Sequence, residues 1–155
     1  MRRYLLDTNM LLGFIRGAEW ARETFARLDF AAEDCITFTS SISRGEILAL
    51  AERNGWGPKK RNKLEAGLRQ FSALGIDKES VSYAYAKITA WSQGKPIEPE
   101  TFGLAPKPAK PMKQNDAWIA AIAYASNAIL VTTDGDFDHL DGRIIEVETV
   151  DQRNS

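Results

Sequence analysis

Short, continuous apolar runs alternate with longer segments of helical character along most of the chain. Tyr4–Leu6, Cys35–Phe38 and Ala128–Val131 predict buried strands, because each is apolar or β-branched without a polar face. Gly75–Asp77 and Ile144–Ile145 predict two further short strands. Strands that alternate with helices and are covered on both faces indicate a three-layer α/β/α sandwich with a central, mainly parallel sheet.

The segments between these runs carry apolar side chains at helical spacing. Ser40 and Ser41 provide capping hydroxyls for a helix that continues to about Arg53. The segment from Asp116 to Ala125 is apolar on nearly all sides, which predicts a buried helix. The remaining helices are expected over Met10–Arg16, Glu19–Ala32, Lys59–Phe71 and Glu79–Ser92.

The segment from Gly94 to Met112 interrupts this alternation. It holds five of the chain's six prolines and two of its glycines. Proline removes a backbone donor and restricts the preceding residue, so we expect a long loop here. No repeat or change of composition marks a second domain, and we expect one domain over residues 1–150 followed by a short tail at 151–155.

Composition narrows the class of protein. Hydrophobic residues make up 44% and charged residues 26% of the chain, as in globular domains. The longest fully apolar run, Ala117–Ala125, is too short for a membrane span, and Asp7 interrupts the only stretch that begins like a signal peptide. A single cysteine, Cys35, excludes an internal disulfide, so we expect the protein to reside in a reducing cytoplasm.

Acidic residues follow the predicted strands at the places where ligands bind in open α/β sheets. Asp7 directly follows the first strand, and Asp134 follows the strand that ends at Val131. Glu46 lies early in the helix after the second strand, and Asp116 opens the buried helix. Because the carboxyl ends of parallel strands share one edge, these four acids are expected to gather there.

The surroundings of two of these acids favour a metal site over a solvated surface. Glu46 lies between Ile42 and Leu50 on one helical face, and Asp116 shares a face with Ile119. Carboxylates in such places need a compensating charge, and oxygen ligands without a histidine or cysteine cluster suit Mg²⁺ or Mn²⁺. The alternative for any single acid is a turn or helix-cap role.

The segments that carry these acids resemble the motifs of the PIN-domain family. Asp7-Thr8-Asn9 resembles the opening motif, and Ser43–Ile47 resembles the one with the family's glutamate. Asn115–Ala121 is similar to the Asp-x-x-Ile-Ala-Ala motif, and Val131–Phe137 to Thr-x-Asp-x-Asp-Phe. The resemblance implies catalytic and metal-binding roles for Asp7, Glu46, Asp116 and Asp134, with Asp136 as a second candidate beside Asp134. Thr8, Asn9 and Thr132 either orient these carboxylates or serve as turn residues.

The length and layout are most similar to VapC-type toxins of toxin–antitoxin pairs. That resemblance implies a Mg²⁺-dependent endoribonuclease with RNA as substrate, a homodimer, and a cognate antitoxin protein as partner. The net charge of −1 is compatible with RNA, because the chain outside the four acids is modestly basic. The loop from Gly94 to Met112 is longer than the connection expected in such proteins.

Other functions are compatible with parts of the pattern. A PIN-like module could bind RNA or protein with weak or no catalysis. A phosphoryl-transfer enzyme could use Asp7 as nucleophile, although Asn9 stands where the haloacid dehalogenase pattern has a second aspartate. The basic residues are either phosphate contacts or a solvated surface, and His139, Cys35 and the tryptophans are expected to be structural. The basic residues in question are Lys59–Arg61, Lys63, Lys107, Lys110 and Lys113.

Overall fold

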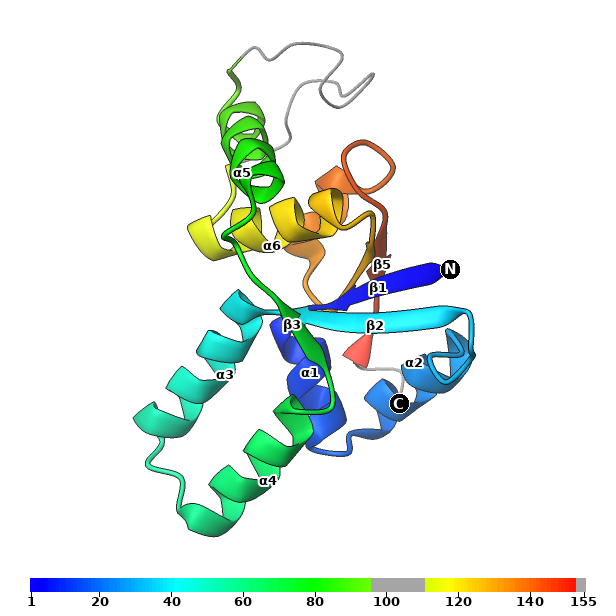
Figure 1. The fold of residues 1–155 in the computed structure, drawn as a ribbon, viewed down its shortest axis with the longest axis vertical. Helices are drawn as coiled ribbons and strands as arrows, with labels where there is room; N and C mark the ends of the chain where they lie inside the picture. The colour runs from blue at the N-terminus through cyan, green and yellow to red at the C-terminus, as the bar shows by residue number, and fades with distance from the viewer. Residues whose placement is uncertain (96–110, 153–155) are drawn as a thin grey trace.

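The computed structural model describes residues 1–95 and 111–152, and a five-stranded sheet organises them (Figure 1). Every strand is parallel to its neighbours, and their order across the sheet is β3-β2-β1-β4-β5. The strands are β1 (Arg2–Leu6), β2 (Cys35–Ser40), β3 (Ser72–Leu74), β4 (Ile129–Thr132) and β5 (Val147–Thr149).

Helices cover both faces of this sheet (Figure 1). One face carries α5 (Glu79–Ser92), α6 (Gln114–Ala125) and the short 3₁₀ helix η1 (Gly135–Leu140). The other carries α1 (Thr8–Ile15), α2 (Glu19–Arg27), α3 (Ser41–Arg53) and α4 (Pro58–Leu68). This arrangement confirms the predicted three-layer α/β/α sandwich. None of the described helices combines the length and hydropathy that a membrane span requires.

The central strand contributes to both hydrophobic cores. Leu5 packs with residues of α5, α6 and η1, whereas Tyr4 and Leu6 pack with residues of α1, α3 and α4. Leu130 and Val131 of β4 are divided between the two cores in the same way. Successive side chains of a strand point to opposite faces, so burial on both faces explains the continuous apolar runs.

The two outer strands were placed wrongly by the apolar pattern. Strand β3 is Ser72–Leu74, and the predicted Gly75–Asp77 lies in the connection to α5. Strand β5 is Val147–Thr149. Of the predicted pair, Ile144 is a buried turn residue after η1, and Ile145 is buried in an isolated bridge with Asp141. Edge strands are partly exposed, so these two carry polar residues and lack the apolar signature of the central strands.

The helix predicted over Glu19–Ala32 ends earlier, at Arg27. The chain then turns at Asp29, whose φ is 52°, a backbone conformation that aspartate tolerates better than most residues. Leu28 and Phe30 still pack on the core, which is why the apolar spacing continues past the end of the helix.

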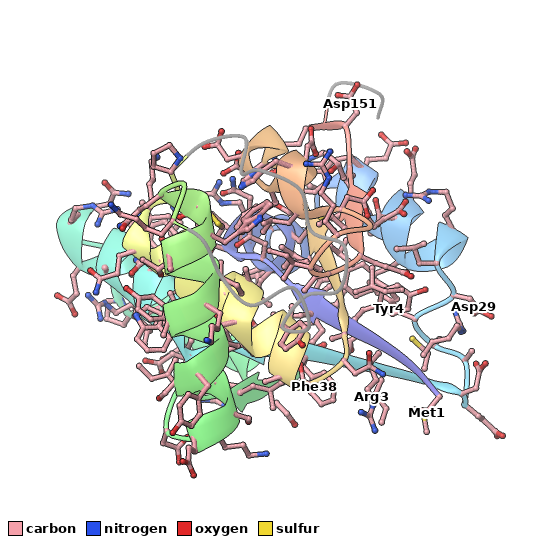
Figure 2. The ribbon with its side chains drawn as sticks, turned by 90° about the horizontal axis from the view of Figure 1, so that it is seen from above. Met1, Arg3, Tyr4, Asp29, Phe38 and Asp151 are labelled. Atoms are coloured by element: carbon pink, nitrogen blue, oxygen red, sulfur yellow. The ribbon has the colours of Figure 1, made fainter. Side chains whose placement is uncertain are left out.

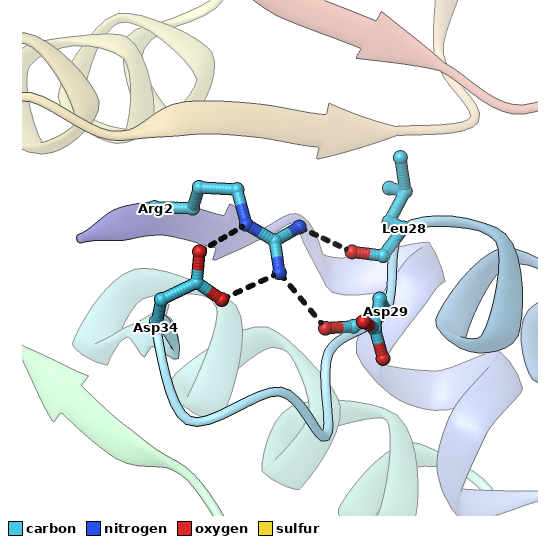
Figure 3. Close-up of polar contacts among 4 residues, drawn as sticks. All are labelled: Arg2, Leu28, Asp29 and Asp34. Atoms are coloured by element: carbon cyan, nitrogen blue, oxygen red, sulfur yellow. Dashed lines mark hydrogen bonds and ion pairs between the residues drawn. The ribbon is translucent and has the colours of Figure 1, made fainter.

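Arg2 fastens this turn to the start of β1 (Figure 3). Its guanidinium donates to the carbonyl oxygens of Leu28, at 2.7 Å, and Asp29, at 3.2 Å. It also forms an ion pair with Asp34 at 3.0 Å, and this hydrogen-bonded contact holds the pKa of the Asp34 carboxyl below its usual value. The contacts tie α2, the turn and the first residue of β1 together.

A glycine in α1 allows α2 to pack closely. A Cβ on Gly13 would lie 2.4 Å from Cη2 of Trp20, an atom of a rigid ring.

We expect Gly13→Ala to lower the free energy of unfolding by about 1–3 kcal/mol, the usual cost of overpacking. Gly45 in α3 is the matched control, because a Cβ there meets no described atom within 4 Å outside its own helix. Gly45→Ala should stabilise by about 0.5–1 kcal/mol. Urea unfolding of both variants tests the difference, and equal effects would contradict it.

Candidate metal and catalytic site

The strand order places a crevice at the carboxyl ends of β1 and β4. After β1, the chain forms β2 and β3 on one side of β1 and then β4 and β5 on its other side. Such a reversal separates the loops that leave the two neighbouring strands and creates the usual ligand site of open α/β sheets. Asp7 follows β1 and Thr132 ends β4, so both lie at this crevice.

Asp7 is held in place by hydrogen bonds to both carboxylate oxygens. Oδ1 accepts from the backbone N–H of Thr8 at 2.7 Å, which caps α1, and Oδ2 accepts from Oγ1 of Thr132 at 2.7 Å. Asp7 is 6% exposed. Burial raises the pKa of Asp7 above its ordinary value, the two hydrogen bonds oppose this rise, and the negative charges of Glu46 and Asp134 add to it.

Thr8 connects Glu46 to the same site. Its hydroxyl donates to Oε1 of Glu46 at 2.8 Å and lies 2.9 Å from Oγ of Ser43. Ser43 is fully buried and precedes Glu46 by three residues, so both face α1 from the first turns of α3. Sequence reasoning missed Ser43, although its helical spacing from Glu46 could have indicated it.

Asp116, Asp134 and Asp136 form a cluster on the other side of the crevice. Each offers one carboxylate oxygen, and the three oxygens lie within 4.8 Å of one another. Asp116 is in the first turn of α6, and Asp134 is the N-cap of η1, where Oδ1 accepts from the N–H of Asp136 at 2.8 Å. Asp134 in turn donates its N–H to Oγ1 of Thr132 at 3.0 Å. Thr132 therefore links this cluster to Asp7.

The collected carboxylates create a strongly negative site. Burial, together with the negative charges of Asp7 and Asp134, raises the pKa of Asp116 to about 6, and the charge of Lys113 opposes this rise. Within residues 1–95 and 111–152, none of Asp7, Glu46, Asp116 and Asp134 forms an ion pair with a lysine or arginine.

These residues fit a divalent cation. The donors are carboxylate oxygens, which hard cations such as Mg²⁺ and Mn²⁺ prefer. Around Mg²⁺, ligand oxygens at about 2.1 Å lie up to about 4 Å apart, so small side-chain rotations would close the 4.8 Å cluster around one ion. The four acids singled out from the sequence, together with Asp136, lie at one edge of the sheet. Their role as ligands stays a prediction.

An open cavity of about 660 Å³ adjoins these acids. It extends from Asn9 and Asp134 along the carboxyl end of β5. Figure 2 shows Asp151 at the opposite edge of the molecule from Met1 and Arg3, which lie at the amino end of β1. This cavity could not be predicted from the sequence, because the last strand was expected at Ile144–Ile145 and lies at Val147–Thr149. Its lining residues are Asn9, Thr133, Asp134, Thr149, Val150, Asp151 and Gln152.

Comparison with known families and structures agrees with this geometry. The chain matches the PIN domain model over residues 4–143 and therefore belongs to the PIN domain family. Comparison with curated proteins gives no significant match.

The fold is shared with toxin–antitoxin structures. VapBC2 from Rickettsia felis, solved bound to a DNA fragment from its promoter, aligns with a TM-score of 0.70 and 20% identity over 96% of this chain and 99% of that one. FitAcB from Neisseria gonorrhoeae aligns with a TM-score of 0.63 and 26% identity over 98% and 99% of the two chains. VapBC-5 from Mycobacterium tuberculosis aligns with a TM-score of 0.59 and 21% identity over 97% and 100%.

Asp134 and Asp136 are expected to contribute unequally to metal affinity. Asp134 is joined to Asp7 through Thr132, whereas Asp136 contacts Asp134 through its backbone N–H. We expect Asp134→Asn to weaken Mn²⁺ binding about tenfold or more, and Asp136→Asn only a few-fold. Asparagine caps helices well, so the turn should survive. Calorimetric titration with Mn²⁺ measures both affinities, and a larger loss in Asp136→Asn would reverse the ranking.

Proposed function

We propose that this protein is a divalent-metal-dependent endoribonuclease and the toxin of a toxin–antitoxin pair. The observation that carries the proposal is the group of carboxylates at the crevice of a PIN domain, where no described lysine or arginine pairs with Asp7, Glu46, Asp116 or Asp134. Mg²⁺ or Mn²⁺ is the expected cofactor. We assign catalytic and metal-binding roles to Asp7, Glu46, Asp116 and Asp134, and a metal-binding role to Asp136.

The chain's own residues prepare the site for hydrolysis. Asp7, Asp116 and Asp134 are the first candidates to hold the ion, which when bound would supply a Lewis acid and lower the pKa of a water molecule. Thr8 and Thr132 fix the carboxylate of Asp7 in advance, so little reorganisation is needed on binding. The Thr8 hydroxyl donates to Oε1 of Glu46. We assign the other oxygen, Oε2, the role of accepting a hydrogen bond from a water molecule and orienting it.

The geometry of Asp7 argues against a phosphoryl-transfer enzyme. A nucleophilic carboxylate must present an oxygen to the phosphorus of its substrate. Both oxygens of Asp7 accept hydrogen bonds, and the residue is 6% exposed. Asp7 is better suited to hold a cation than to attack a phosphate.

A protein partner is the second part of the proposal. The structural relatives are VapBC and FitAB complexes, and the first aligned one is a toxin–antitoxin pair bound to promoter DNA. A negative site can be neutralised by an arginine or lysine of a partner as well as by a metal. We therefore expect an antitoxin tail that brings such a cation to Asp7, Glu46 and Asp116 and packs beside α2. A homodimer is the expected state of the free protein.

Two assays test the proposal. The purified protein should cleave single-stranded RNA with Mg²⁺ or Mn²⁺ and not with EDTA. Co-expression with the product of the adjacent short gene should give a stable complex that lacks ribonuclease activity. Failure to cleave any RNA in the presence of metal would overturn the nuclease assignment. An active nuclease that no neighbouring gene product binds would overturn the toxin–antitoxin part alone.

A further inference from the structure

A second cavity of about 240 Å³ lies next to the one beside the acids. The two share Thr149, Val150 and Asp151, so they adjoin at the carboxyl end of β5. We name the combined feature the β5 groove. It runs from Asp134 at the metal-binding cluster to the face of α2 on which Thr24 is buried and Trp20 is half-buried. The residues that α2 contributes are Trp20, Glu23, Thr24 and Arg27.

The part of the β5 groove next to the acids is lined by hydroxyl and amide side chains. Thr133 and Thr149 contribute hydroxyls, and Asn9 and Gln152 contribute amides that can donate and accept. These groups match the edges of nucleobases and the ribose 2′-hydroxyl, which proteins read in single-stranded RNA. They lie directly beside Asp134, where the scissile phosphate is expected.

The far end of the β5 groove contains a fixed aromatic ring. The ring of Trp20 lies against Gly13 so closely that a Cβ there would be 2.4 Å from it. Trp20, Glu23 and Arg27 follow one another at helical spacing and share the face of α2 that lines the groove. Arg27 forms an ion pair with Glu148 of β5 at 2.8 Å, which joins the two walls. A rigid tryptophan in such a wall can stack on a base.

The charges of the β5 groove favour bases over phosphates. Glu23, Asp134 and Asp151 contribute negative charge to its walls. Among the lining residues that the structure describes, the one cation is Arg27, and Glu148 already pairs with it. A phosphate backbone would be repelled inside the groove, whereas the uncharged bases would not.

We propose that the β5 groove binds the bases of the RNA strand on one side of the cleavage point. Thr133, Asn9 and Gln152 contact the base or ribose next to the scissile phosphate, and Trp20 stacks on a base further along, with the phosphates turned outward. The inference rests on the proposed ribonuclease function and adds the strand's path and the residues that set base preference.

The experiment combines RNA binding with cleavage mapping. Fluorescein-labelled octanucleotides of A, C or U, and a mixed sequence with G, are titrated with protein in EDTA and followed by anisotropy. Trp20→Leu is expected to lower the affinity for the best-bound RNA about tenfold, the usual effect of losing one stacked base. The matched control is Trp56→Leu, because Trp56 is half-buried, stacks under Lys60 and does not line the groove.

A second pair of variants tests base preference. Thr133→Val removes a hydroxyl at constant shape and should change the preferred base beside the cut at least threefold in a randomised RNA pool. Thr37→Val in β2, which is also partly buried, is the control and should leave the preference unchanged. Should Trp20→Leu fail to fold, RNA that carries 5-bromouridine should crosslink to Trp20 of the wild-type protein, as identified by mass spectrometry.

The outcomes separate this inference from the proposed function. The wild-type protein could cleave RNA while both groove variants keep its affinity and base preference, or while no crosslink forms at Trp20. Either result would contradict RNA binding by the β5 groove and leave the ribonuclease assignment unchanged. Wild-type protein that neither binds nor cleaves any of the RNAs overturns both.

Discussion

Replacing Asp7 by asparagine is expected to lower RNA cleavage about 100-fold or more while the fold is retained. The substitution removes one negative charge from the group that must hold the cation, an effect comparable to losing a preorganised electrostatic group at an active site. An asparagine can keep both contacts, since its oxygen can accept from the N–H of Thr8 and its amide can donate to Thr132.

The control for this loss is a remote aspartate. Asp77 is exposed in the connection between β3 and α5, and Asp77→Asn should cleave at the wild-type rate. Cleavage rates under matched Mg²⁺, together with circular dichroism of each variant, provide the comparison. An Asp7→Asn protein that cuts RNA as fast as the wild type would show that the site is assigned wrongly.

The second large effect is the dependence of metal binding and stability on pH. Burial, together with the negative charges of Asp7 and Asp134, raises the pKa of Asp116 to about 6 in the folded, metal-free protein, above its ordinary value of 3.8. Between these values the folded state binds more protons than the unfolded state, so the free energy of unfolding falls as pH rises towards 6 and stays low above it. Divalent cations bind the deprotonated carboxylate, and their affinity should therefore rise over the same interval.

Thermal unfolding from about pH 4.5 to pH 8, with EDTA or with saturating Mn²⁺, measures both effects. The melting temperature in EDTA should decrease with pH, and the increase on adding Mn²⁺ should be largest above about pH 6. Above that pH in EDTA, the Asp116→Asn protein should have a higher melting temperature than the wild type. Adding Mn²⁺ should raise its melting temperature less than that of the wild type. A stabilisation by Mn²⁺ that does not change with pH, or is the same in Asp116→Asn, would contradict the role of Asp116.

The sequence indicated the centre of the fold better than its edges. Strands β1 and β4 are buried on both faces, and residues such as Leu5 and Leu130 therefore form continuous apolar runs. At the edges, Ser72 and Thr149 belong to strands but are exposed, while the turn residue Ile144 is buried. Hydrophobicity indicates which residues are buried. At the edges of this sheet the buried residues are not the ones that pair in strands, so the apolar pattern did not locate these strands.

The acids could be identified because their positions follow from topology alone. Asp7 and Asp134 come after central strands, and parallel strands bring their carboxyl ends to one edge. The hydrogen bonds of Thr8 and Thr132 depend on side-chain rotamers that no pattern specifies. The β5 groove depends on where the edge strand lies and on a residue in α2, so contacts distant in sequence create it.

We propose that the carboxylates at the carboxyl ends of β1 and β4 hold a divalent metal ion. An anomalous difference map from crystals grown with Mn²⁺ tests it most directly. We expect a peak about 2.1 Å from carboxylate oxygens of Asp7, Asp116 or Asp134. A protein that cleaves RNA with Mn²⁺ but shows no peak among these residues, or only a peak elsewhere, would contradict it.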